Sequence, residues 1–173
     1  MKKSMLVAAA LVGVAIAGGV AAALLRDSPG QPESLAPVTK RLPVTIEDQT
    51  FTLVDGVTTR NGETVKIVDQ QISGDVSGDG RPDAALLISD DPGGSGTFYY
   101  AALAIGDDGS WRTTNVVPLG DRIKPEGIDF TDGRFVYRFL DRKPGEPMAA
   151  TPTVRKAVPI WFDAKSGRIS AAG

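Results

Sequence analysis

The chain has 173 residues, with no cysteine and no histidine, and its formal net charge at pH 7 is −2. These counts exclude disulfide bonds and catalytic Ser–His or Cys–His pairs. Without Lys2, Lys3 and Arg26 the chain carries 16 basic and 21 acidic side chains, a net charge of −5. This balance argues against nucleic acid as a partner, because nucleic-acid binding needs a basic face.

An apolar run from Met5 to Leu25 follows the two N-terminal lysines. Its 21 residues match the roughly 20 that a helix needs to cross a bilayer, and the lysines favour a cytoplasmic N-terminus. We therefore predict a signal-anchor transmembrane helix over residues 1–26. A cleaved secretory signal is the alternative, because residues 21–23 (Ala-Ala-Ala) offer a small-residue cleavage site. Both interpretations export the rest of the chain; cleavage would release it as a soluble periplasmic domain.

Residues 27–42 are rich in proline and poor in apolar side chains, which is typical of an extended linker. Residues 43–173 are then predicted to form one exported β-rich domain, since about 130 residues can build a hydrophobic core.

The predicted domain is a succession of strands and turns. Residues 44–60 alternate apolar and polar side chains and break at Asp55-Gly56, a hairpin signal. Residues 84–89 and 97–105 are nearly continuous apolar runs, as expected for central strands buried on both faces. Later strands are predicted at 127–130, 134–140 and 154–163, with a turn at Asp132-Gly133.

The fold class predicted from this pattern is all-β, mainly antiparallel, with about seven to nine strands in a sandwich or a strongly curved half-barrel. A helix hidden in one of the two apolar runs is the alternative.

The segment from Asp75 to Asp83 resembles a calcium loop. Oxygen-bearing side chains stand at positions 1, 3, 5 and 9, and Gly80 stands at position 6, where the chain turns sharply. The predicted ligands of one Ca²⁺ ion are Asp75, Ser77, Asp79, the Arg81 carbonyl and Asp83. The glutamate expected at position 12 is absent, since Leu86 occupies it. The alternative is a pair of Asx-turns without an ion.

Two family resemblances arise from these residues. The Asp-rich loop and the apolar strand after it are similar to the calcium loops of integrin-type β-propeller repeats and dockerins, although only one copy is present. The segments "GDVSGDGRPDAA" and "GGSGTFYY" resemble an uncharacterised bacterial exported domain, often a lipoprotein, over about residues 50 to 165. That resemblance implies an exported protein and implies no activity, and this chain differs from the lipoprotein members in its anchor. The predicted anchor instead indicates a location at the bacterial inner membrane, with the C-terminal domain in the periplasm.

The remaining motifs do not point to catalysis. The "GGSG" stretch before Phe98 lacks the lysine of a phosphate loop, and Ser95 does not lie in a nucleophile elbow. Phe98 and Tyr100 are predicted on one face of a strand and Tyr99 on the other. We therefore expect no catalytic residues and a non-enzymatic, membrane-tethered binding or accessory module, compatible with an accessory subunit of an integral membrane complex. A hydrolase is the alternative.

Overall fold

The computed structural model describes Val38, residues 40–72 and residues 74–171. The predicted transmembrane helix, residues 1–26, and most of the predicted linker lie outside these residues. Within the described ranges, no helix is long and apolar enough to cross a membrane.

The described part is all-β, as predicted, and both apolar runs form strands rather than helices. It contains twelve strands: β1 (Leu42–Ile46), β2 (Gln49–Leu53), β3 (Val57–Arg60), β4 (Glu63–Ile72), β5 (Ala84–Asp91), β6 (Phe98–Asp107), β7 (Ser110–Thr113), β8 (Val117–Asp121), β9 (Lys124–Thr131), β10 (Arg134–Asp141), β11 (Val154–Asp163) and β12 (Arg168–Ala171). The count exceeds the predicted seven to nine because β3, β7, β8 and β12, of four or five residues each, are separate short strands.

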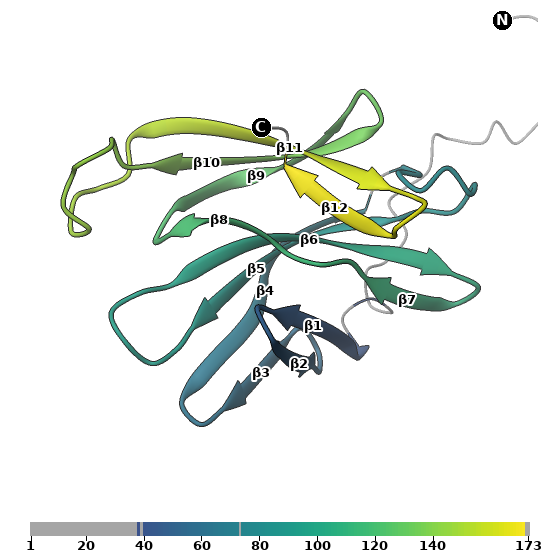
Figure 1. Ribbon diagram of the computed structural model, residues 1–173, viewed down its shortest axis with the longest axis horizontal. Helices are drawn as coiled ribbons and strands as arrows, with labels where there is room; N and C mark the ends of the chain where they lie inside the picture. The colour runs from purple at the N-terminus through teal and green to yellow at the C-terminus, as the bar shows by residue number, and fades with distance from the viewer. Residues whose placement is uncertain (1–37, 39, 73, 172–173) are drawn as a thin grey trace, which may run out of the picture. The chain divides into compact units, whose positions relative to one another are not determined.

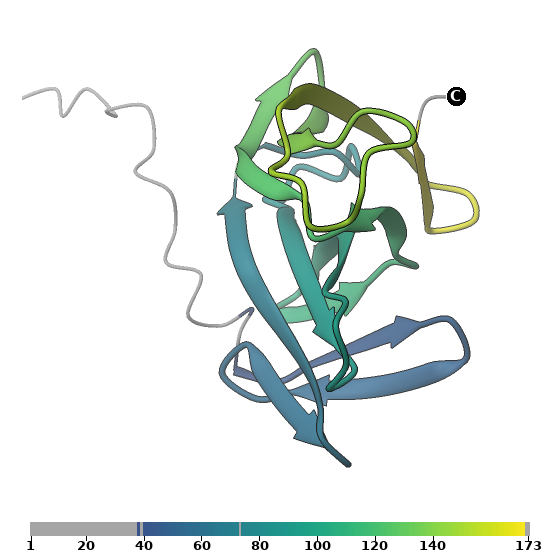
Figure 2. The same ribbon diagram turned by 90° about the vertical axis from the view of Figure 1, so that its left-hand side faces the viewer.

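The strands form a hairpin and two larger sheets, all with antiparallel neighbours. The hairpin is β1–β2, the central sheet has the order β3-β4-β5-β6-β7 with β8 also paired to β6, and the third has the order β12-β11-β10-β9. The hairpin lies on one side of the central sheet and the β9–β12 sheet on the other (Figure 1). The central sheet is strongly curved, which gives the half-barrel shape visible in the turned view (Figure 2).

Strands β5 and β6 are buried on both faces, as their apolar runs predicted. Leu86 and Ile88 of β5 pack toward the hairpin, in the first core cluster. Their neighbours Ala85 and Leu87 face the second cluster, beneath the β9–β12 sheet. Burying a large apolar side chain is worth about 1.5–3 kcal/mol, so two cores supply most of the stabilisation in this cysteine-free domain.

The second core is built around aromatic side chains of β10. Phe135, Tyr137 and Phe139 are at most 2 % exposed, and truncating one of them to alanine would cost about 3–5 kcal/mol. The Tyr137 hydroxyl lies 2.8 Å from the Ala102 carbonyl oxygen and 3.1 Å from that of Leu86, and so donates to the backbone of the central sheet. The aromatic row therefore fixes the two sheets to each other through polar as well as apolar contacts.

Candidate functional site

The predicted calcium residues lie in one loop between β4 and β5. Asp83, at its end, is fully buried. Its Oδ2 accepts the backbone N–H groups of Val76 and Ser77, both at 2.9 Å, and its Oδ1 accepts that of Gly106 at 3.1 Å. The Asp83 carboxylate thus holds the loop against the end of β6.

The exposed half of the loop is organised by Asp75. Its Oδ1 accepts the N–H groups of Gly78 and Asp79, at 2.6 and 2.9 Å, and its Oδ2 accepts that of Gly80 at 2.6 Å. The Ser77 hydroxyl lies 3.1 Å from Oδ1. These bonds, that from Gly80 first, hold the pKa of Asp75 below its ordinary value.

Asp79 faces a basic side chain rather than the other carboxylates. Its Oδ2 accepts the guanidinium of Arg81 at 2.8 Å, and this bond is the main reason that the pKa of Asp79 is lowered. The other arm of Arg81 reaches Asp108 at 2.6 Å. Among the described residues, no three Asp or Glu side chains converge on a point that could hold a metal ion. The structure brings the five residues together as hydrogen-bonded turns, and calcium binding stays a prediction.

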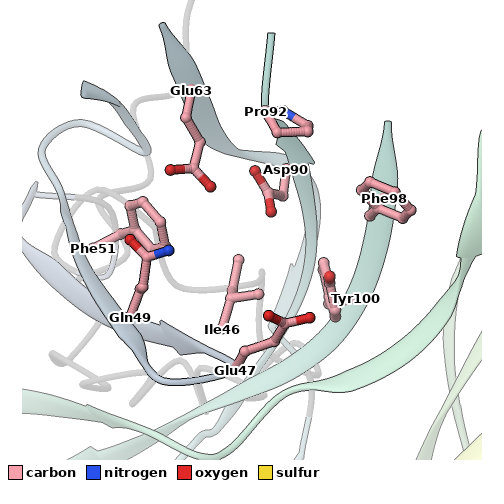
Figure 3. Close-up of a pocket in the computed structure, with 9 residues that line it drawn as sticks. All are labelled: Ile46, Glu47, Gln49, Phe51, Glu63, Asp90, Pro92, Phe98 and Tyr100. Carbon is pink, nitrogen blue, oxygen red and sulfur yellow. The ribbon is translucent and has the colours of Figure 1, made fainter. Parts of the chain in front are cut away.

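A pocket of about 240 Å³ lies at the opposite end of β5. Antiparallel pairing places the end of β5 beside the starts of β4 and β6, and the β1–β2 hairpin covers this edge. The residues that line the pocket are Ile46, Glu47, Gln49, Phe51, Glu63, Asp90, Pro92, Phe98 and Tyr100 (Figure 3). Asp90 is remote from the Asp-rich loop, because it lies seven positions along the extended chain from Asp83, about 23 Å at 3.3 Å per residue.

Asp90 is the unusual residue of this pocket. It is 7 % exposed, and its Oδ1 is buried with no hydrogen-bond partner among the described residues. Burial first, and then the adjacent Glu63 carboxyl group, through its negative charge and a shared side-chain hydrogen bond, raise the pKa of the Asp90 carboxyl to about 6. Buried carboxylates are normally paired or hydrogen-bonded, so a carboxylate placed in this way makes the pocket a candidate functional site.

Two further carboxylates line the same pocket as Asp90. Glu63, at the start of β4, is half-buried, and Glu47, in the turn between β1 and β2, is exposed. Figure 3 shows the carboxylates of Glu63, Asp90 and Glu47 directed into the pocket. Within the described residues, none of the ion pairs involves these three acids.

Aromatic rings form the rest of the wall. Phe98 and Tyr100 point to the hairpin side of β6 while Tyr99 packs into the second core, as strand alternation predicted. Phe98 remains 40 % exposed. Phe51 comes from β2, and the guanidinium of Arg60 lies 4.7 Å from the centre of its ring.

Sequence reasoning did not find this pocket. Strand β5 runs away from the Asp-rich loop, so Asp90 at its far end does not contribute to that loop. One sequence feature did point to Asp90. Side chains alternate between the two faces of a strand, so Asp90 lies on the same face of β5 as Leu86 and Ile88, which is buried. Nothing in the sequence placed Glu47 or Glu63 beside it. Comparisons with protein-family models, with characterised proteins and with solved structures give no match.

Proposed function

We propose that this protein is a non-enzymatic binding module, exported across the bacterial inner membrane and held there by its N-terminal helix. The observation that carries the binding role is the buried Asp90 carboxylate in an open pocket lined by Phe98 and Tyr100, because its Oδ1 has no hydrogen-bond partner among the described residues. The tether is inferred from the apolar run over residues 5–25. A module of this kind suits an accessory subunit of a membrane complex, whose ligand or partner occupies the pocket.

Photo-crosslinking tests the binding role. The full chain is expressed in a bacterial host with benzoylphenylalanine at Phe98, on the pocket rim, or at Trp161, which is 46 % exposed on β11 of the other sheet. Irradiation should give a discrete adduct from position 98 and none from position 161. Equal labelling at the two positions, or none at either, would argue against a macromolecular partner at the pocket.

Fractionation tests the tether. If residues 1–26 form a membrane anchor, the full chain stays in the membrane pellet after a carbonate wash. Recovery of a soluble form whose mature N-terminus lies at or just after Leu24 would instead establish the cleaved, periplasmic alternative. Both results are compatible with the same pocket.

A hydrolase is the second candidate, and one observation favours it. The pKa of Asp90 is raised beside a second carboxyl group, Glu63, as in glycosidases that use one carboxylic acid and one carboxylate. Protonated Asp90 would act as the general acid and donate its proton to the leaving oxygen when water cleaves the bond. Release of nitrophenol from a panel of nitrophenyl glycosides, lost in Asp90→Asn, would favour this candidate over a binding module.

A further inference from the structure

All the charged residues that line the pocket are acidic. Three of its nine lining residues are acids, Glu47, Glu63 and Asp90, and none is lysine or arginine. Arg60 contacts two residues of the pocket wall: its guanidinium donates to the Gln49 Oε1 atom at 2.6 Å and stacks on Phe51. It forms no ion pair with the three acids in the described structure. The ligand that complements this pocket is therefore positively charged.

When Asp90 and Glu63 are both ionised, the buried Oδ1 of Asp90 has no donor among the described residues. Leaving a buried acceptor unpaired is unfavourable, and more so for a charged group. A ligand N–H⁺ group in the pocket would supply both the missing hydrogen bond and the opposite charge. A neutral hydroxyl ligand would supply only the bond and leave the repulsion between Asp90 and Glu63 in place.

The aromatic wall indicates an organic cation rather than a metal ion. Cations lie favourably over the faces of aromatic rings, and the rings of Phe51, Phe98 and Tyr100 line this pocket. Arg60 on Phe51 is an instance of this contact within the chain itself. A calcium or magnesium ion would need several oxygens converging at about 2.0–2.6 Å, and no three acids of the described residues converge in this way.

We infer that the pocket binds an organic ammonium or guanidinium group, with Asp90 and Glu63 as its counter-ions and Phe98 and Tyr100 against its apolar stem. This inference rests on the proposed binding function and adds the ligand class. The same cationic group can come from a free amine or from a lysine or arginine side chain of a partner protein.

The test uses the full chain in detergent micelles with ¹³C-labelled phenylalanine and tyrosine, so that ring signals of Phe98 and Tyr100 report occupancy. Three probes are titrated at pH 7.5: butylamine, the blocked peptide acetyl-Gly-Lys-Gly-amide, and its neutral match acetyl-Gly-Gln-Gly-amide. Both cationic probes should shift these rings with millimolar or tighter Kd, and the glutamine peptide should bind at least about tenfold more weakly. Tighter binding of the lysine peptide than of butylamine identifies a partner side chain as the source, and the reverse identifies a free amine.

Matched variants test whether the carboxylates of the pocket bind the cationic probes. Asp90→Asn and Glu63→Gln should each weaken the cationic probes by about tenfold or more, because each removes a counter-ion. Asp91→Asn removes the same charge one residue away, from an exposed side chain outside the lining, and should stay within about twofold. Asp90→Asn is expected to fold at least as well as the wild type, so weakened binding would not reflect unfolding.

Three outcomes would overturn the inference. Equal affinity for the lysine and glutamine peptides would show that the pocket does not select a cation. Unchanged binding of the cationic probes in Asp90→Asn, or no ring shift with either cationic probe, would contradict it as well. If position 98 still crosslinks a partner in any of these cases, the binding module stands with a ligand of another class; if it does not, the proposed function fails as well.

Discussion

Asp83 and Gly106 join the start of β5 to the end of β6, because Oδ1 of Asp83 accepts the Gly106 N–H at 3.1 Å inside the protein. The same carboxylate accepts two N–H groups of the preceding loop through Oδ2. Both of its oxygens are used by the backbone, so the primary role of Asp83 in the described structure is to fix the loop.

Replacing Asp83 by alanine should therefore lower the free energy of unfolding by about 3–5 kcal/mol, since one buried and two partly buried N–H groups lose their acceptor. Urea titration of the full chain in micelles, followed by tryptophan fluorescence, measures the change. Asp107→Ala, which removes an exposed carboxylate nearby, should alter stability by about 0.5 kcal/mol or less. Equal effects of the two substitutions would contradict the anchoring role.

Gly106 is also required for close approach of the backbone. A Cβ atom at this position would lie 2.7 Å from the carbonyl oxygen of Pro82, and a backbone atom cannot rotate away. We expect Gly106→Ala to destabilise the domain by about 2 kcal/mol or more. Gly94→Ala is the matched control, because its Cβ would meet nothing within 4 Å, and it should be neutral or stabilising by up to about 1 kcal/mol. Thermal melting of both variants measures the two effects. If Gly106→Ala has the stability of the wild type, the close backbone approach does not require glycine at this position.

Asp90 should make the stability of the protein depend on pH. Its pKa is about 6 in the folded state, against about 3.9 in an unfolded chain. Between these values the folded protein holds the proton and the unfolded chain does not, so the contribution of Asp90 to stability is fully present below about pH 4 and is lost as pH rises through about 6. Glu63, Glu47 and Asp91 are the charged groups that repel the ionised form.

Asp90→Asn removes the loss of stability that ionisation of the buried carboxyl causes. The variant should equal the wild type near pH 4 and exceed it by about 1–3 kcal/mol at pH 7. Urea titrations at pH 4, 5, 6 and 7 measure the difference, and Asp91→Asn should keep the pH dependence of the wild type. If the curves of Asp90→Asn and wild type run parallel, Asp90 is paired in solution, and the argument for a free counter-ion in the pocket is lost.

The fold was largely predictable because its signals are local. The Asp55-Gly56 pair forms the predicted two-residue turn, with φ of 51° and 81° and Val54 hydrogen-bonded to Val57 on both sides. The Asp132-Gly133 turn forms in the same way, at φ of 52° and 72°. Alternation located the strands. The packing of the β1–β2 hairpin on the central sheet was not predictable, because that choice depends on contacts between distant segments.

The pocket was not predictable because it also depends on contacts between segments that are distant in the sequence. Its acids come from a turn, from the start of β4 and from the end of β5, and the curvature of the sheet brings them together. Asp90 also precedes Asp91, Pro92 and Gly93, so in sequence it resembles a turn residue. Pairing with Val65 instead keeps it within β5, on the buried face.

Calcium binding by the Asp-rich loop remains to be tested. The contacts of Arg81 suggest a variant for this test, because Arg81 binds one of the predicted calcium ligands. A carboxylate has about four lone-pair sites, so Asp75 Oδ2, which accepts only Gly80 in the described structure, can also face a cation. The Arg81 guanidinium already occupies Asp79 and would compete with the ion.

If Ca²⁺ binds with a Kd of about 1 mM, as in extracellular-type sites, then 10 mM calcium should stabilise the full chain by about 1.4 kcal/mol relative to chelator. Arg81→Gln frees Asp79 while keeping the backbone carbonyl, and should enlarge this response. Asp79→Ala should abolish it and also cost stability in chelator, because its hydrogen bond to the Arg81 N–H is lost. Melting temperatures of the three proteins, with calcium and with chelator, give the answer. A wild type and an Arg81→Gln variant that both ignore 10 mM calcium would mean that these aspartates serve only to shape the turn.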